Sequence, residues 1–265
     1  MPEKSWILTR TQVALTFKSR GQRHLLPQTL YKDGYAMISI AIDGPSGAGK
    51  STISRRAAEM FGFIYVDTGA IYRTIGLASK THGVSLDDKA AVIAMLPELK
   101  IDLKYNAAGE QHMYLDGKDV SRDIRLPEVS MLASKVSAIP EVRAFLVDMQ
   151  RDMAKRYDVI MDGRDIGTVI LPDADLKIFL TADVSDRAHR RYEELCAKGI
   201  EKPFEEVLAE MKQRDEQDTA RAAAPLKAAD DAVMLDTSGN TLEESIAEVC
   251  RLIADKTGRK IGERP

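Results

Sequence analysis

The chain has too few cysteines for a disulfide scaffold or a cysteine-based metal site. Only two cysteines occur among its 265 residues, and Cys196 and Cys250 each lie in a stretch with the pattern of a helix. Neither shows metal-ligand or Cys-x-x-Cys spacing. We interpret both as buried or free thiols in a reducing compartment, and we expect the protein to be cytoplasmic.

The chain also lacks a long hydrophobic run and a large charge of one sign. No segment approaches the ~18 consecutive apolar residues that a membrane span requires. The formal net charge is -3, from 38 basic and 41 acidic side chains. Such a balance gives no general attraction to nucleic acid or to an anionic membrane, so we predict neither as a partner. Any anion site must come from a local cluster of basic residues.

Residues 1–36 differ from the rest of the chain in charge. They carry six basic and two acidic side chains, a net charge of +4, which leaves -7 for the remainder. An Arg-rich, acid-poor N-terminal segment can be a targeting peptide. Because this one shows no clear amphipathic period, the preferred interpretation is an extension upstream of a start at Met37. We predict that it is poorly ordered.

From Met37 onward, short apolar segments alternate with longer stretches of helical periodicity. This alternation predicts an α/β fold with a parallel sheet, right-handed crossovers and helices on its faces. With 44% hydrophobic residues, the chain can bury one substantial core. Strands are predicted at residues 37–42, 63–66, 159–162, 176–180 and 233–235, and helices at 51–61, 69–80, 87–95, 127–137, 140–156, 184–198, 203–216 and 242–256.

Two regions within the predicted domain, residues 37–265, depart from this alternation. Residues 99–120 alternate in polarity and contain the pair Asp116-Gly117, which predicts a small antiparallel hairpin. We assign this hairpin to an insertion at about residues 97–150. Two long, highly charged helices separated by Gly199 predict a helical hairpin, and we assign it to a lid at about residues 185–222.

The segment Gly44–Ser51 matches the phosphate-loop pattern G-x-x-x-x-G-K-[ST] in full. It follows a predicted strand and opens a predicted helix, which is the context that phosphate binding requires. The glycines let backbone N–H groups face phosphate oxygens, and the helix N-terminus adds partial positive charge. We expect Lys50 to reach the β- and γ-phosphates and Ser51 to ligate Mg²⁺. The predicted ATP-binding residues of this loop are Gly44, Pro45, Ser46, Gly47, Ala48, Gly49, Lys50, Ser51 and Thr52.

Two further motifs follow predicted core strands at the edge where ligands of such sheets bind. Asp67 to Arg73 follows the second strand, and we expect Arg73 to contact a phosphate. Thr68 is either a nucleotide contact or the cap of the next helix. Asp162 ends the third strand, where it is expected to hold Mg²⁺ through water. The alternative for Asp162 is ordinary Asp-Gly turn chemistry.

Charged rows on the predicted lid suggest phosphate contacts. Arg214, Asp218 and Arg221 share one face if their helix continues beyond residue 216. The alternative is a surface row of salt bridges, which stabilises little. A closing hairpin would bring cations to the phosphates of ATP, whereas the alternative is a solvated face. The second row, assigned to ATP binding, consists of Arg187, Arg190 and Arg191.

Together these motifs resemble those of the bacterial cytidylate kinases, in content and in order. The resemblance extends from about Met37 to Lys256. It implies a P-loop NTPase fold of the nucleoside monophosphate kinase type, with a core sheet, a lid and an acceptor-binding insertion. The matching segments are 42–50, 67–73, 162–168, 177–180, 187–191 and 214–221.

The resemblance also implies an activity and residue roles. The activity is phosphorylation of CMP and dCMP by ATP with Mg²⁺, in pyrimidine nucleotide metabolism. The implied catalytic residues are Lys50, Arg73, Arg164 and Arg221, the three arginines holding the acceptor phosphate, with Ser51 and Asp162 at the metal. The remaining substrate contacts implied are Ser134, Arg143 and Asp165 at the cytosine edge, Arg214 and Asp218 at the ribose, and Thr68, where the family commonly has Ser.

Two other functions stay open at this point. A GTP-dependent switch would need an Asn-Lys-x-Asp guanine-reading motif, which the chain does not contain. A kinase of another small metabolite would share the phosphate loop and would differ in its preferred acceptor. The sequence leaves open the relative preference for CMP, dCMP and UMP. In the absence of a long apolar seam, we predict a monomer.

Overall fold

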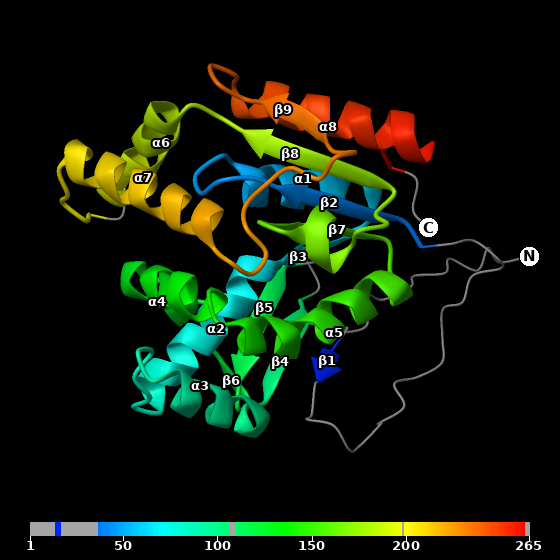
Figure 1. The fold of residues 1–265 in the computed structure, drawn as a ribbon. Helices are drawn as coiled ribbons and strands as arrows, with labels where there is room; N and C mark the ends of the chain where they lie inside the picture. The colour runs from blue at the N-terminus through cyan, green and yellow to red at the C-terminus, as the bar shows by residue number, and fades with distance from the viewer. Residues whose placement is uncertain (1–13, 17–36, 107–109, 198, 263–265) are drawn as a thin grey trace, which may run out of the picture.

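The computed structural model of this protein describes residues 14–16, 37–106, 110–197 and 199–262. Figure 1 shows a central sheet between helices, a second region around a smaller sheet, and a helical hairpin that projects to one side. No helix in these ranges is long and apolar enough to cross a membrane.

Five parallel strands form the central sheet, in the order β3-β7-β2-β8-β9. Neighbouring strands are far apart in sequence because each parallel pairing requires a crossover connection. The prediction of a parallel α/β sheet is therefore confirmed. The strands are β2 (Ser39–Asp43), β3 (Ile64–Asp67), β7 (Val159–Gly163), β8 (Leu176–Thr181) and β9 (Val233–Asp236).

The central strands bury side chains on both faces of the sheet. In β2, Ile40 and Ile42 pack into one apolar core and Ala41 into the other. Because neither face meets water, the strand is a continuous apolar run in the sequence. Helices α1 (Lys50–Phe61) and α8 (Leu242–Thr257) supply the first core, and α2 (Thr68–Thr81) and α5 (Pro140–Arg156) contribute to the second.

The antiparallel pairing predicted within residues 99–120 is present, with Ile101 of β4 opposite Leu115 of β5. The pair Asp116-Gly117, from which the turn was predicted, joins β5 to β6 rather than β4 to β5. Of residues 1–36, the structure describes only β1 (Ala14–Thr16), which pairs antiparallel with β4, and the predicted poor order of the remainder lies outside the described residues. The other elements between α2 and α5 are α3 (Lys89–Met95), η1 (Leu96–Glu98), β4 (Ile101–Tyr105), β5 (Gln111–Leu115), β6 (Lys118–Asp119), η2 (Asp123–Arg125) and α4 (Pro127–Ser137).

The helical hairpin consists of α6 (Val184–Ala197) and α7 (Phe204–Ala220). A small apolar cluster that includes Leu195 and Met211 holds the two helices together. Helix α7 runs four residues beyond its predicted end. Arg214 and Asp218 therefore share a helical face as predicted, but Arg221 directly follows the last residue of the helix and is not part of that face.

Candidate active site

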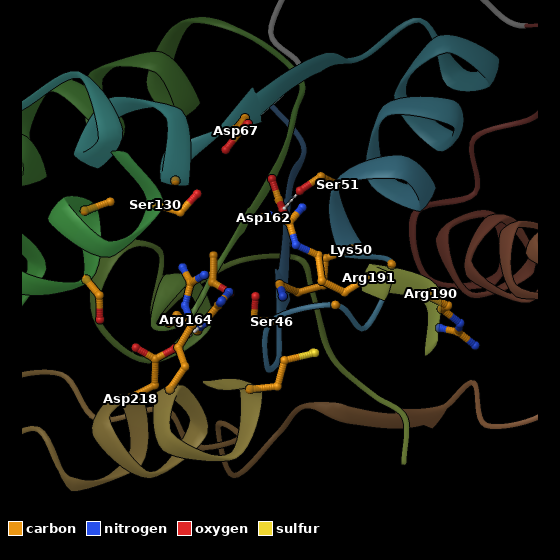
Figure 2. Close-up of a pocket in the computed structure, with 18 of the residues that line it drawn as sticks. Ser46, Lys50, Ser51, Asp67, Ser130, Asp162, Arg164, Arg190, Arg191 and Asp218 are labelled. Atoms are coloured by element: carbon orange, nitrogen blue, oxygen red, sulfur yellow. Dashed lines mark hydrogen bonds and ion pairs between the residues drawn. The ribbon is translucent and has the colours of Figure 1, made fainter. Parts of the chain in front are cut away.

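A cavity of about 900 Å³ lies at the carboxyl end of the central sheet, between the phosphate loop, the insertion and the helical hairpin. Charged side chains from all three regions line it. Figure 2 shows Lys50, Ser51 and Asp162 on one side of this space and Arg164 with Asp218 on another. Ligands of open α/β sheets bind at this edge.

The phosphate loop takes the conformation that its glycines permit. Gly44 has φ +147°, and a Cβ there would lie 1.9 Å from the carbonyl oxygen of Leu180. The loop can therefore pass close to β8 only with glycine at this position. Lys50 is the first residue of α1, and its Nζ donates a hydrogen bond to the carbonyl of Pro45 at 2.6 Å.

Lys50 is 5% exposed. Burial lowers the pKa of its ammonium well below the ordinary value, and the nearby Arg164 lowers it further. Both effects penalise the charged form when the cavity holds no anion. A phosphate group in the loop would offset this penalty, because its negative charge would favour the charged form of Lys50.

Ser51 and Asp162 face each other across the base of the cavity. The Ser51 hydroxyl donates to Asp162 Oδ2 at 2.7 Å, and the Tyr65 hydroxyl donates to Asp162 Oδ1 at 2.9 Å. Burial, with the nearby charge of Asp67, raises the pKa of Asp162 to about 6. A cation beside this carboxylate would favour its ionised form.

The oxygen donors of Ser51 and Asp162 fit Mg²⁺, which binds a few protein oxygens and completes its shell with water and phosphate. Within the described ranges, no three His, Cys, Asp or Glu residues are grouped to hold a metal ion by themselves. Ser51 and Asp162 are therefore the residues that would hold Mg²⁺ at this site.

Arginine side chains crowd the other side of the cavity around one buried carboxylate. Asp218 accepts a hydrogen bond from Arg164 Nε at 2.8 Å, and Arg221 Nη1 lies 3.7 Å from its other oxygen. Burial alone would raise the pKa of Asp218, but these arginines hold it below the ordinary value. Burial, then repulsion from Arg164, lowers the pKa of Arg214 to about 10.

Several guanidinium donors here have no partner. Among the described residues, Arg73 Nε, Arg214 Nε and Arg221 Nη2 are buried and lack a hydrogen-bond acceptor. Buried donors without acceptors are rare in folded proteins and carry a desolvation cost. All three side chains line the cavity, so each is a candidate donor to a bound anion.

Asp67 positions Arg73 at the end of β3. Its Oδ2 accepts from Arg73 Nη2 at 2.7 Å, and its Oδ1 accepts from the N–H of Ala70 as the cap of α2. Asp67 is therefore the helix cap, and the alternative that Thr68 caps this helix is wrong. The Thr68 hydroxyl instead donates to the carbonyl of Asp162 at 2.7 Å.

The insertion holds this end of β3 through side chains. The amide of Gln111 on β5 accepts from the N–H of Asp67 at 2.9 Å and donates to its carbonyl at 3.3 Å. Two residues earlier on β3, the carbonyl of Tyr65 accepts from the hydroxyl of Tyr105 on β4 at 2.8 Å. The small sheet is thus attached to the strand that carries Asp67 and, through it, Arg73.

A buried ion pair lies in the wall of the cavity next to α5. Arg143 on α5 pairs with Asp165, and the exposed fractions of the two side chains are only 7% and 5%. Arg143 also donates to the carbonyl of Ser137 at 3.1 Å and lies over the ring of Tyr72. Ser134 lines the same wall from α4. Together these residues offer hydrogen-bond donors and acceptors in one part of the cavity, which is what recognition of the edge of a planar ligand needs.

The sequence model of the family described as "Cytidylate kinase" matches residues 40–255. The cytidylate kinase of Caldicellulosiruptor saccharolyticus is 49% identical over 84% of this chain and 99% of its own length. The chain belongs to the cytidylate kinase family. The family's enzyme from Lactobacillus johnsonii is 44% identical over 83% of this chain and 95% of its own length. A shikimate kinase structure from Bacteroides thetaiotaomicron is 14% identical, with a TM-score of 0.42, over 84% and 99% of the two chains.

Most residues predicted to act at the site do line the cavity. Four do not: Gly44, Pro45, Ala48 and Arg187, of which the first three shape the loop from behind. Those that line it are Ser46, Gly47, Gly49, Lys50, Ser51, Thr52, Thr68, Arg73, Ser134, Arg143, Asp162, Arg164, Asp165, Arg190, Arg191, Arg214, Asp218 and Arg221.

Arg187 is buried and fully engaged by protein atoms. Its guanidinium donates to the carbonyls of Ala182 and Ser46 and to the Asp215 carboxylate, at 2.7–2.9 Å. It therefore ties both helices of the hairpin to the phosphate loop. Arg190 and Arg191 reach the cavity, and Figure 2 shows Arg190 at its margin.

Some lining residues carry no signal in the sequence motifs. Asn240 and Thr241 line the donor side, before α8. Thr241 also begins this helix with a capping box, in which its side chain accepts from the N–H of Glu244 and the Glu244 carboxylate accepts from the N–H of Thr241. The Ser/Thr-x-x-Glu pattern predicts a helix start. The pattern does not predict that this helix start lies at the cavity, because that position depends on the order of the strands in the sheet.

Proposed function

We propose that this protein transfers the γ-phosphoryl group of ATP to CMP or dCMP, forming ADP and CDP or dCDP. Membership of the cytidylate kinase family supports the reaction. The observation that carries the assignment is the pair of buried, unpartnered N–H donors of Arg73 and Arg221 next to a phosphate loop. This arrangement suits two phosphate groups held end to end.

On the donor side, we assign ATP to the phosphate loop. Backbone N–H groups of the loop and the N-terminus of α1 would hold the phosphate oxygens. Lys50 would follow the transferring group, and Arg190 and Arg191 would approach as the hairpin closes. Mg²⁺ held near Ser51 and Asp162 would neutralise phosphate charge. The chain itself contributes position and fixed positive charge.

On the acceptor side, we assign the monophosphate to Arg73, Arg164 and Arg221. Arg164 and Arg221 already share the Asp218 carboxylate, so their positions are set before an anion arrives. Pre-set cations need little reorganisation during reaction, which is the main source of catalysis in phosphoryl transfer. We place the ribose at Arg214 and Asp218, the cytosine edge at Ser134, Arg143 and Asp165, and a nucleotide contact at Thr68.

Closure of α6 and α7 over the cavity would exclude water, which otherwise competes with CMP as the acceptor. The hairpin packs through its own small core, so it can move as one body. We retain the predictions of a cytoplasmic monomer without nucleic-acid or membrane partners.

An acceptor panel tests the proposal. Purified protein is supplied with ATP, Mg²⁺ and one of CMP, dCMP, UMP, AMP or shikimate, and ADP formation is followed in a coupled assay. We expect kcat/KM to be highest for CMP and dCMP. A higher value for UMP would contradict the role of Asp165 at the base, and a higher value for AMP or shikimate would contradict the proposed function.

A further inference from the structure

Asp43 is a buried carboxylate between the two halves of the cavity. It is the last residue of β2 and directly precedes Gly44, the first residue of the phosphate loop. Its side chain is absent from the cavity lining, and the residue is 5% exposed. It nevertheless lies where the phosphate loop meets the segment that follows β7.

The carboxylate of Asp43 binds two consecutive N–H groups of a segment more than a hundred residues away. Oδ1 accepts from the N–H of Ile166 at 2.8 Å, and Oδ2 accepts from the N–H of Gly167 at 2.7 Å. These N–H groups begin η3 (Ile166–Ile170), a single π-helical turn. Charge-assisted bonds of this length are about twice as strong as neutral ones.

The segment that Asp43 holds carries two of the proposed acceptor contacts. Arg164 and Asp165 directly precede the bound N–H groups, and Asp165 itself forms the buried pair with Arg143. In the sheet, Asp43 lies opposite Gly163 in the register of β2 with β7. The Asp43 side chain therefore extends this pairing past the end of the strands.

Gly167 packs against both the Asp43 carboxylate and the Lys177 side chain. A Cβ added to Gly167 would lie 3.4 Å from Asp43 Oδ2 and 3.2 Å from the stem of Lys177. Burial raises the pKa of Asp43 to about 6, against the opposing effect of its two backbone hydrogen bonds. The fold thus retains a buried carboxylate at a desolvation cost, where an apolar side chain could not anchor η3.

Resting on the proposed function, we propose that Asp43 is a positioning residue for phosphoryl transfer: it sets the acceptor segment Arg164–Gly167 in register with the phosphate loop. In-line transfer depends on the separation and alignment of the two nucleotides, and a misplacement of ~1 Å can cost about 10² in rate. Asp43 touches neither nucleotide in this scheme.

The test compares Asp43→Asn with a matched variant, Asp158→Asn. The asparagine keeps the shape of Asp43 and can accept only one of the two N–H groups, because its NH₂ faces the other donor. Asp158 is likewise buried and anchors the opposite end of β2. Its Oδ1 accepts from the N–H of Ile38 at 2.7 Å and its Oδ2 from Arg259 at 2.8 Å.

For Asp43→Asn we expect kcat for CDP formation to fall about 10²-fold, with the Kd values of ATP and of CMP, each measured alone, changing less than about threefold. We also expect more than one ADP per CDP, because a misplaced acceptor leaves water to compete. Asp158→Asn should lower the unfolding temperature and keep both kcat and the one-to-one ratio.

If Asp43→Asn does not fold, Asp43→Glu, which keeps the charge and moves the carboxylate by one methylene, should show the same uncoupling. A wild-type protein that forms no CDP would defeat the proposed function itself. A wild-type protein that forms CDP, beside a folded Asp43→Asn or Asp43→Glu variant with unchanged kcat and ratio, would overturn the role of Asp43 alone.

Discussion

The donor half of the cavity, which we assign to ATP, is built mainly on one continuous loop, Gly44–Ser51, with residues of α6 and of the start of α8 beside it. The acceptor half, which we assign to CMP, is assembled from α2, α4, α5, α7 and the segment that follows β7. A loop of this kind binds anions mainly through its backbone geometry, so a short sequence motif is enough to predict it. The acceptor half depends on buried ion pairs between elements far apart in sequence, such as Arg164 with Asp218. Substitutions in the donor half should abolish phosphoryl transfer. Substitutions in the acceptor half should leave the binding of ATP unchanged.

The largest expected effect is that of Lys50→Ala. Under the proposed contact of Lys50 with the transferring phosphate, its loss should reduce kcat by about 10³ while the protein stays folded. Rates from the coupled assay and a circular dichroism spectrum check this. Lys155→Ala, which changes an exposed lysine of α5, serves as the control and should match wild type. Near wild-type kcat in folded Lys50→Ala would remove the distinction between the halves.

The second prediction concerns stability and Asp162. Because its pKa rises from 3.8 to about 6 in the folded protein, the folded state binds this proton more tightly than the unfolded chain. The ionised form therefore costs stability above pH 6, and that cost disappears as the pH falls toward 4. Relative to Asp162→Asn, wild type should gain up to about 3 kcal/mol between pH 7 and pH 4.

Urea unfolding of both proteins at several pH values, in EDTA and without nucleotide, measures this difference. A stability difference that stays constant across the range would contradict the raised pKa. That result would mean that the surroundings of Asp162 are more polar than its burial and its two hydroxyl partners indicate.

The third prediction separates the halves directly. Arg73→Lys keeps the charge and loses the planar, multidentate donor set. We expect kcat/KM for CMP to fall about 10²-fold, the KM for ATP to change less than about threefold, and the unfolding temperature to stay near that of wild type. Arg259→Lys, which alters an arginine paired with Asp158, should leave both KM values unchanged. An equal rise in both KM values for Arg73→Lys would show that the halves are not independent.

The smallest effects are expected where the insertion meets β3. Gln111→Ala removes both amide contacts with Asp67 and should cost about 1–2 kcal/mol of stability, with a two- to fivefold rise in the KM for CMP. Tyr105→Phe removes one bond to the same strand and should lower stability without changing that KM. Identical KM values in the two variants would contradict the link from Gln111 to Arg73.

How far the sequence predicts this structure depends on which contacts are local. The hairpin of β4 and β5, the helices that begin at Pro127 and Pro140, and the phosphate loop follow from short-range patterns, and the structure confirms them. The family resemblance supplied the acceptor residues, which composition alone left undecided.

Tertiary contacts account for what the sequence did not predict. The Asp67–Arg73 pair joins residues of one quoted motif, but its existence depends on the turn at the start of α2. The engagement of Arg187 by Ser46 and Asp215 depends on how the hairpin docks on the loop. The extension of α7 to Ala220 reflects the burial of Asp218 among arginines, which outweighs the weak local signal for a helix there.

The amide of Gln111 has a consequence for association between molecules. Strand β3 ends the central sheet on one side, and an open border of this kind invites pairing with another chain. By engaging both the N–H and the C=O of Asp67, the glutamine mimics one link of a neighbouring strand and blocks such pairing there. A side chain, unlike a sixth strand, achieves this without merging the two sheets.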